Sequence, residues 1–334
     1  MRVEQVRGGV VEAWHDVHVA VVDGGGRLVA QAGDPELVTF WRSAAKPFQA
    51  APLVEDGVLE RFGITGEELA LACASHSSEA GQVAKVRELL VKIGCSERDL
   101  LCGPHPPLSE RVAQDYESRG VRLTPVYSNC SGKHAGMLAL ARHHGWPTAF
   151  YTRPEHPVQQ RCLAEVSRWT GVSREEIRTG VDGCGVVCFA LPLRNMAWAY
   201  ARLSIADVGM RMTDSQAASS IRNRQSAIVR SMLHHPDLVA GDGRPCTEIM
   251  RAHPGRVIAK VGAEGVYCAL LVGEGLGVAL KVADGHAFAS ALAMAAVLEG
   301  LGLRPLPSSL GVRPNLNTRG EPVGELRVNG GLKQ

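Results

Sequence analysis

Strand-forming segments lie at both ends of this 334-residue chain, and a mainly helical pattern separates them. Near the N-terminus, residues 17–22 and 27–31 flank a turn of three glycines after Asp23, which predicts a β-hairpin. The last third contains apolar runs separated by glycine-rich turns, at residues 256–260, 266–272 and 277–282. A long helix from about residue 286 comes after them. This order predicts an α/β fold in which one sheet is closed by the two chain ends and a helical lobe is inserted between them.

The chain is long enough to bury one large core or two lobes. We expect a single domain over the whole chain, residues 1–334. Its α/β lobe would be formed by about residues 1–70 and 255–334, and its helical lobe by about residues 71–254.

Several helices are predicted in the middle of the chain. One begins after Ser43 and runs to Glu55, with a proline tolerated in its first turn. Residues 173–176, Ser-Arg-Glu-Glu, have the form of a capping box. Roughly residues 193–252 have a helical pattern, but no motif within 206–240 fixes the register of the helices there.

Composition excludes several classes of protein. A formal net charge of +2 gives no reason to expect nucleic acid or an anionic membrane as partner. The first residues lack the apolar run of a signal peptide, and residues 287–303 have the pattern of a packed helix, not of a membrane span. The nine cysteines lack the spacing of a secreted disulfide scaffold, so we expect reduced thiols in the cytoplasm.

Ser43 and Lys46 carry the first chemical signal. On a helix these positions share a face, so the amine can reach the hydroxyl. A lysine whose pKa is depressed can take the proton of a serine, whereas an arginine cannot. Only seven of the 36 basic residues are lysines, and Lys46, Lys133 and Lys260 lie among small residues. The spacing is the one with which penicillin-binding proteins and class A β-lactamases begin acyl transfer.

Two further segments fit that comparison. Lys260-Val261-Gly262, at the end of a predicted strand, resembles the Lys-Thr-Gly signature of those enzymes. Tyr127-Ser128-Asn129 resembles their Ser-x-Asn element, and the order of the three elements is kept. A second cation at position 260 would help to keep Lys46 neutral by like-charge repulsion.

Cys130 and Cys184 are thiols in open surroundings. Cys130 lies at the start of a predicted helix, where a thiolate is favoured, and precedes Lys133 and His134. Cys184 stands between two glycines. Two cysteines do not make a structural zinc site, which needs four protein ligands. They are either part of an open metal site completed by another group and water, or two unrelated buried thiols.

Taken together, five motifs resemble those of the rhizobial-type L-asparaginases (asparaginase II, or class 3), from about residue 5 to residue 330. The motifs are Arg42-Ser43-x-x-Lys46-Pro47, Ala74-Ser75-His76, Asn129-Cys130-Ser131-Gly132-Lys133-His134, Asp182-Gly183-Cys184-Gly185 and Lys260-Val261-Gly262-Ala263-Glu264-Gly265. The resemblance implies a fold like that of serine β-lactamases and glutaminases, a homodimer, and hydrolysis of L-asparagine to L-aspartate and ammonia.

The resemblance also implies roles for individual residues. Ser43 would be the nucleophile and Lys46 its base, with Ser75 and Lys260 as a second Ser-Lys pair that relays protons. The implied zinc ligands, with water in the fourth position, are Cys130, Lys133 and Cys184. The implied substrate-binding residues are Asp182 for the α-amino group, Arg42 and His134 on the pocket wall, and Cys246 as a pocket cysteine.

Three alternatives stay open at this point. One is a glutaminase or β-lactamase-like enzyme that acts on related amides. Another is a cofactor-independent amino-acid racemase that uses Cys130 and Cys184 as its two bases. The last is an amino-acid sensor without activity, which leaves both Ser-Lys pairs without a purpose.

Overall fold

The structure, a computed structural model, describes residues 1–204 and 227–333. The part of the expected helical region that falls on residues 205–226 therefore lies outside the described residues.

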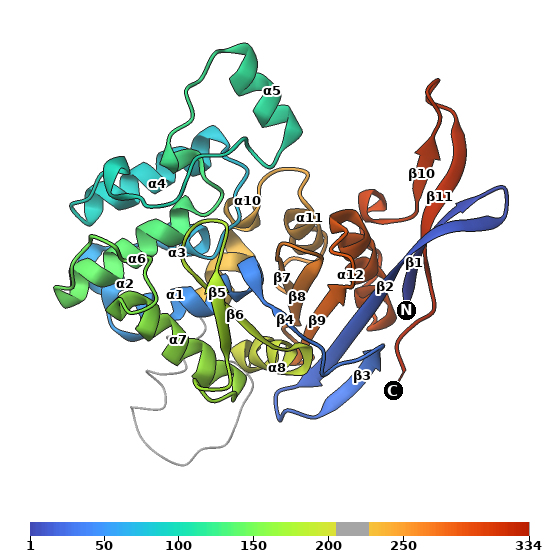
Figure 1. Cartoon of the computed structure of the whole chain (residues 1–334), viewed down its shortest axis with the longest axis horizontal. Coiled ribbons are helices and arrows are strands. Elements are labelled where there is room, and N and C mark those ends of the chain that lie inside the picture. The colour runs from blue at the N-terminus through green and yellow to red at the C-terminus, as the bar shows by residue number, and fades with distance from the viewer. Residues whose placement is uncertain (205–226, 334) are drawn as a thin grey trace.

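An eight-stranded antiparallel sheet forms one side of the molecule (Figure 1). Seven of its strands have the order β10-β11-β1-β2-β9-β8-β7, and β3 pairs with β2 off this path. The strands are β1 (Arg2–Arg7), β2 (Val10–Asp23), β3 (Leu28–Ala32), β7 (Val257–Val261), β8 (Val266–Leu271), β9 (Leu276–Val282), β10 (Arg313–Leu316) and β11 (Pro322–Asn329). Segments from the two chain ends thus pair directly, since β1 pairs with β11.

The predicted hairpin and the three predicted strands near the C-terminus are confirmed. Val19 pairs with Ala32 and Val21 with Ala30 across the glycine turn. In β8 every residue is buried, as its continuous apolar run requires.

Helices and a small sheet form the other side of the molecule (Figure 1). The small antiparallel sheet has the order β4 (Val38–Phe40), β6 (Val187–Pro192), β5 (Arg178–Val181). The helices here are α1 (Lys46–Glu55), α2 (Val58–Phe62), α3 (Gly66–Ala72), α4 (Ala80–Lys92), α5 (Glu110–Ser118), α6 (Ser131–His144) and α7 (Pro157–Thr170). The expected α/β class, with an antiparallel sheet and an inserted helical lobe, is confirmed; the predicted lobe boundaries stay a prediction.

Three of the remaining helices pack on the large sheet: α8 (Leu193–Ser204), α11 (Pro245–Ala252) and α12 (Ala287–Gly300). The short α10 (Pro236–Val239) packs on α11 and α3 instead, and residues 227–234 are also helical. The expected helical pattern over 193–252 is broken in its described part by a turn with positive φ at Gly241 and Gly243.

Residues 173–176 form only half of the expected capping box, since Glu176 N–H donates to the backbone oxygen of Ser173 and not to its side chain, and no helix begins there. Ser173 Oγ donates to Glu176 Oε2 at 2.7 Å, and the chain then enters β5. The local hydrogen bonds therefore close a turn, and pairing of β5 with β6 decides the conformation of the next residues.

Burial of one helix and a close backbone contact of another position the helices that carry the site. All residues of α1 from Lys46 to Val54 are buried, so this helix is enclosed on every side. A Cβ at Gly132 would overlap the carbonyl oxygen of Leu71, so only glycine lets α6 approach the end of α3 this closely. Among the described residues, no helix has both the length and the apolar character needed to cross a membrane.

Candidate active site

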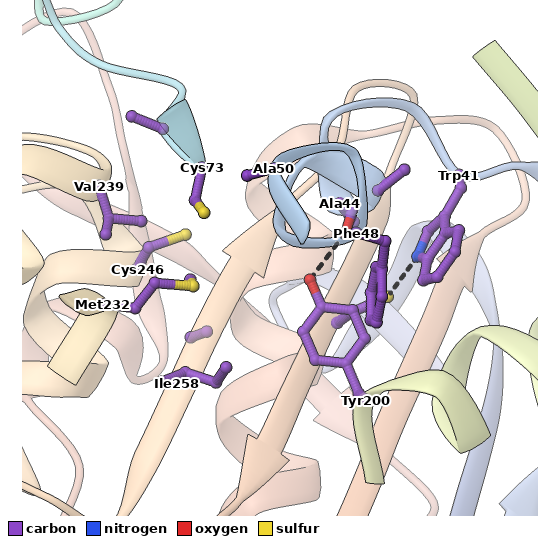
Figure 2. Close-up of a cluster of buried hydrophobic side chains, with 14 of the residues drawn as sticks. Trp41, Ala44, Phe48, Ala50, Cys73, Tyr200, Met232, Val239, Cys246 and Ile258 are labelled. Atoms are coloured by element: carbon purple, nitrogen blue, oxygen red, sulfur yellow. Dashed lines mark hydrogen bonds between the residues drawn. The ribbon is translucent and has the colours of Figure 1, made fainter. Parts of the chain in front are cut away.

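Ser43 lies on a 3-10 turn, η1 (Arg42–Ala45). The residues on either side of it, Trp41 and Ala44, are each held by a hydrogen bond (Figure 2). Before it, the buried Trp41 donates from Nε1 to Cys268 Sγ at 3.3 Å and stacks on Phe48. After it, Tyr200 Oη donates to the carbonyl oxygen of Ala44 at 2.8 Å. Because apolar packing fixes the flanking residues, the position of the Ser43 backbone is fixed as well.

A cavity of about 310 Å³ opens beside this turn. Three segments supply most of its wall: η1, the loop before α6, and the glycine-rich turn after β5. Among the lining residues are Arg42, Ser43, Cys130, Asp182 and Cys184. Five of the residues predicted from sequence are thus brought together, although they are spread over more than 140 positions of the chain. A larger cavity, of about 480 Å³, lies between β1, β10, β11 and α12 and contains none of them.

An ion pair forms the rim of the cavity. Arg42 Nε lies 2.9 Å from Asp182 Oδ1, and Arg42 Nη1 lies 3.8 Å from Glu264 Oε1. Burial raises the pKa of Asp182, but the charges of Lys133 and Arg42 outweigh it and the pKa is lowered overall. Arg42 adopts a left-handed conformation, φ 52°, which side chains tolerate only where the surroundings impose it. The result is an ionised carboxylate on the wall of the cavity that Ser43 also lines.

Three residues after Ser43 along the chain begins the amine cluster, which we define as Lys46, Ser75 and Lys260. Both lysines are fully buried and Ser75 is almost so. Lys46 Nζ donates to Ser75 Oγ at 3.0 Å and to Ala74 O at 2.5 Å. Lys260 Nζ lies 2.8 Å from the same Ser75 Oγ and donates to Val261 O at 2.9 Å. One hydroxyl therefore bridges two amines.

The two amines of the amine cluster cannot both hold a full positive charge at low cost. Burial, and then the charge of Lys46, lower the pKa of Lys260 to about 7. Neither hydrogen bond of Lys46 goes to Ser43, so the contact between Ser43 and Lys46 stays a prediction. Such contacts commonly tighten only when substrate binds.

The same cavity is lined by two cysteines of the thiol wall, which we define as Cys130, Lys133 and Cys184. Lys133 Nζ donates to Cys184 Sγ at 3.0 Å. A hydrogen bond from Cys130, with the charge of Lys133, lowers the pKa of Cys184 to about 4. That same bond, together with burial, raises the pKa of Cys130 to about 12. Cys184 is therefore the thiolate of the pair, and the thiol of Cys130 and the ammonium group of Lys133 stabilise its negative charge.

The thiol wall fits zinc in the number and kind of its donors. Two sulfurs and one nitrogen leave a fourth tetrahedral position open. Among the described residues, no three His, Cys, Asp or Glu side chains are grouped so as to hold a metal ion, because here the third donor would be a lysine. Both Lys133 and Cys130 would have to lose a proton to bind it.

The two other predicted pocket residues lie deeper in the protein. His134 is fully buried, and its Nδ1 lies 2.6 Å from Tyr151 Oη. Cys246 is also buried, and its Sγ accepts from Val261 N at 3.2 Å and from Tyr267 Oη at 3.3 Å. Figure 2 shows Cys246 beside Met232 and Val239 in an apolar cluster. In this position it supports the strand residue next to Lys260.

Sequence reasoning assigned no role to several residues that the structure brings to the site. Glu264 reaches Arg42 across the rim from a strained position, φ 55°. His105 Nε2 accepts from Asn129 N at 3.0 Å and so holds the residue before Cys130. His76 Nε2 lies 2.8 Å from Ser131 Oγ, which joins the segment of Ser75 to α6. His76 and Glu264 belong to two of the five motifs, but nothing in the sequence shows which residues they contact.

Comparison with solved structures gives weak likenesses at low identity. A putative β-lactamase from Bacteroides dorei is 13% identical over 83% of this chain and 89% of its own, with a TM-score of 0.43. A β-lactamase from Mycobacterium bovis is 15% identical over 82% and 89%, with a TM-score of 0.36. The structure titled Mglu in its glutamate form is 16% identical over 88% and 63%, with a TM-score of 0.39.

The match to a family is much more extensive. No curated protein matches the chain. In contrast, the model of the L-asparaginase II family matches residues 3–328, which include every residue predicted for the site. The expected family is confirmed, and with it the broad class of amidohydrolase. The chain belongs to the L-asparaginase II family.

Proposed function

We propose that the chain hydrolyses L-asparagine to L-aspartate and ammonia through an acyl-enzyme on Ser43. One observation carries the proposal. Ser43 is a hydroxyl on the cavity wall, next to the ion pair of Arg42 and Asp182 and three residues from a fully buried lysine. Ser75, the other serine near the lysines, is 3% exposed and therefore closed to a substrate.

The polar groups of the cavity match the two ends of an amino acid. The ionised Asp182 would bind the α-ammonium group of the substrate, and Arg42 beside it would bind the α-carboxylate. Anchored at this end, the side-chain amide would extend toward Ser43. We propose asparagine, and not glutamine, as the preferred substrate.

The amine cluster would supply the base. A proton can leave Lys46 for Ser75 Oγ while Ser75 gives its own proton to the neutral Lys260, since both amines lie within 3.0 Å of that oxygen. Lys46 is then neutral and Lys260 charged, and the cluster as a whole keeps its proton count.

Neutral Lys46 would next take the proton of Ser43 as the serine oxygen attacks the amide carbon. Backbone N–H groups near Ser43 would stabilise the oxyanion. When the carbon–nitrogen bond breaks, protonated Lys46 donates to the leaving ammonia. Water then hydrolyses the β-aspartyl ester, with the same amine acting first as base and then as acid.

Zinc, where present, would be held by Cys130, Lys133 and Cys184. Bound there, it would supply a Lewis acid that orients the substrate. Serine chemistry needs no metal-bound hydroxide, so every proton step of the proposal runs through the amine cluster. Without the metal, the thiolate of Cys184 and the ammonium of Lys133 balance each other's charge.

The racemase alternative is disfavoured by the geometry of the thiol wall. A two-base racemase needs one thiol on each face of the α-carbon, but here Cys130 is hydrogen-bonded to Cys184. Solvent-deuterium exchange at the α-carbon of asparagine or aspartate would reveal such an activity.

Two further features belong to the proposal. We place the enzyme in the cytoplasm, which suits nine cysteines that are all free thiols. We also expect a homodimer, an expectation that rests on the family alone; sedimentation velocity measures it directly.

Release of ammonia by the purified protein tests the proposed function. Asparagine should be the best substrate, ahead of glutamine and a chromogenic lactam. Ser43→Ala should lower kcat by about 10³-fold or more while the unfolding temperature stays within about 2 °C. Comparable turnover in Ser43→Ala would remove Ser43 as nucleophile, and a preference for the lactam or glutamine would replace the substrate.

A further inference from the structure

Two polar side chains that line the cavity of the candidate active site have no hydrogen-bond partner in the described part of the chain. The ion pair of the rim and the two cysteines of the thiol wall are each bonded within the pair. Ser128 Oγ accepts from Cys130 N at 3.4 Å, and both ring nitrogens of His105 are used. The two exceptions, Ser43 and Asn129, therefore hold the polar groups that are left for a ligand.

The backbone of Asn129 is held from two sides. Its N–H donates to His105 Nε2 at 3.0 Å, and its carbonyl oxygen accepts from His76 N at 3.2 Å. His105 Nδ1 lies 2.7 Å from the carbonyl oxygen of Pro106, which can only accept, so the ring proton is on Nδ1 and Nε2 is free to accept. Both sequence neighbours of Asn129 are buried, whereas Asn129 itself is partly exposed. Because both backbone groups are used, the side-chain amide is the polar group that a ligand can meet.

An amide is the chemical match for the uncharged end of the proposed substrate. The α-ammonium and α-carboxylate groups would use Asp182 and Arg42, which are the charged side chains at the rim. The group that remains is the side-chain carboxamide, which has N–H groups to donate. Asn129 offers an oxygen that accepts and carries no charge, so a bond between the two amides buries no unpaired charge.

We propose that Asn129 is a specificity-determining residue that recognises the amide to be cleaved. Its Oδ1 accepts a hydrogen bond from the NH2 group that leaves as ammonia, while Ser43 faces the carbonyl carbon of the same amide. The proposal rests on the proposed function, because it takes an amino-acid amide as the ligand of this cavity. An ester of the same acid has no N–H to donate at this place and loses the bond, so Asn129 distinguishes an amide from an ester.

Two substrates that form the same acyl-enzyme test this contact. L-asparagine and the β-methyl ester of L-aspartate share both α-groups and the same acyl group, but only asparagine has an amide N–H. Because kcat/KM reports the steps up to acylation, the ratio of kcat/KM for asparagine to that for the ester isolates recognition of the amide. We expect Asn129→Leu to lower kcat/KM about tenfold for asparagine and by no more than about threefold for the ester. Asn195→Leu is the matched control and should leave the ratio unchanged, because Asn195 Nδ2 donates to Thr170 O and the residue does not line the cavity.

Asn129→Asp identifies the atom of Asn129 that forms the bond. This variant keeps an oxygen that accepts and removes the N–H groups. Its added charge acts alike on two substrates that have the same α-groups, so the ratio should stay within about threefold of the wild-type value. A ratio that falls in Asn129→Asp as far as in Asn129→Leu would assign the bond to Nδ2 and overturn the proposed contact.

The remaining outcomes separate this contact from the proposed function. Thermal unfolding shows whether Asn129→Leu folds; where it does not, Asn129→Ala removes the amide without adding bulk and must show the same selective loss. Equal falls for asparagine and the ester, or no fall for either, overturn the contact alone, since wild type still hydrolyses asparagine. A wild type that hydrolyses the ester but not asparagine removes the proposed function, and the contact with it.

Discussion

The amine cluster and the thiol wall each bury lysine, and the two environments shift the lysine pKa in opposite directions. Lys260 faces a second amine across Ser75, and its pKa falls to about 7. For Lys133, burial alone would lower the pKa, but the negative charges of Cys184, Cys130 and Asp182 raise it overall. Both side chains are at most 3% exposed. The charge of the neighbour, not the depth of burial, thus decides which lysine can serve as a base.

Because of this difference, we assign different roles to the two regions. The amine cluster holds fewer protons than it has sites, which is the property needed to move a proton. The thiol wall holds an ammonium group against a thiolate, which is a stable charge pair suited to binding. Substitution and labelling in each region can test that separation.

The largest effect is expected in the amine cluster. Lys46→Met removes the proposed base of Ser43 and should lower kcat by about 10³-fold or more. Lys85→Met is the matched control, because Lys85 forms ion pairs with Glu67 and Glu88 away from the cavity. Steady-state ammonia release measures both variants. Equal activity of the two would show that the amine cluster takes no part in catalysis.

Lys260 should give the next largest effect and a distinctive pH dependence. Because its pKa is lowered, the neutral form that accepts a proton increases as pH rises through about 7. We therefore expect kcat/KM to rise from pH 6 to pH 8 with an apparent pKa near 7, and to fall about 10²-fold in Lys260→Met with loss of this step. An unchanged profile in Lys260→Met would assign the titration to another group.

In the thiol wall the expected effect is on reactivity. With a pKa of about 4, Cys184 is a thiolate at pH 6, whereas burial raises the pKa of the half-buried Cys95. Iodoacetamide at pH 6 should therefore label Cys184 at least 10-fold faster than Cys95, as measured by peptide mass spectrometry. Faster labelling of Cys95 would contradict the charge pair of Lys133 and Cys184.

The smallest effect should be on stability alone. Thr65 caps α3, the helix that leads to Ser75, in a capping box with Glu68. Thr65→Ala should lower the free energy of unfolding by about 1 kcal/mol in urea titration, with kcat unchanged at 25 °C. A tenfold fall in kcat would mean that the site depends on this helix end and not on the hydrogen bonds of Ser75.

The strands that were predicted from the sequence are strands that are buried in the core. β8 and β9 are apolar runs ended by glycines, and both were predicted. β10 and β11 were not, since most of their residues are partly or fully exposed and their pattern is polar. Their pairing depends on β1, more than 300 residues away from β11 along the chain, which no local pattern shows.

The residues of the candidate site likewise fall into two groups, those that a local motif indicated and those that only long-range contacts bring in. The spacing of Ser43 and Lys46 and the glycines around Cys184 were visible as local motifs. That Ser75 would bridge two lysines is a contact over 185 residues, and it could only be inferred from the family. The bond between Tyr151 and His134 gave no signal at all, because a tyrosine in a polar loop has no distinctive spacing.

The proton count of the amine cluster is the central claim, and ¹⁵N spectroscopy of lysine side chains measures it directly. The chain has only seven lysines, so Lys→Met variants can assign each Nζ signal. At pH 8 we predict that Lys46 and Lys260 together carry one full ammonium charge, while Lys133 keeps its own. Two full ammonium signals from Lys46 and Lys260 at that pH would contradict the account.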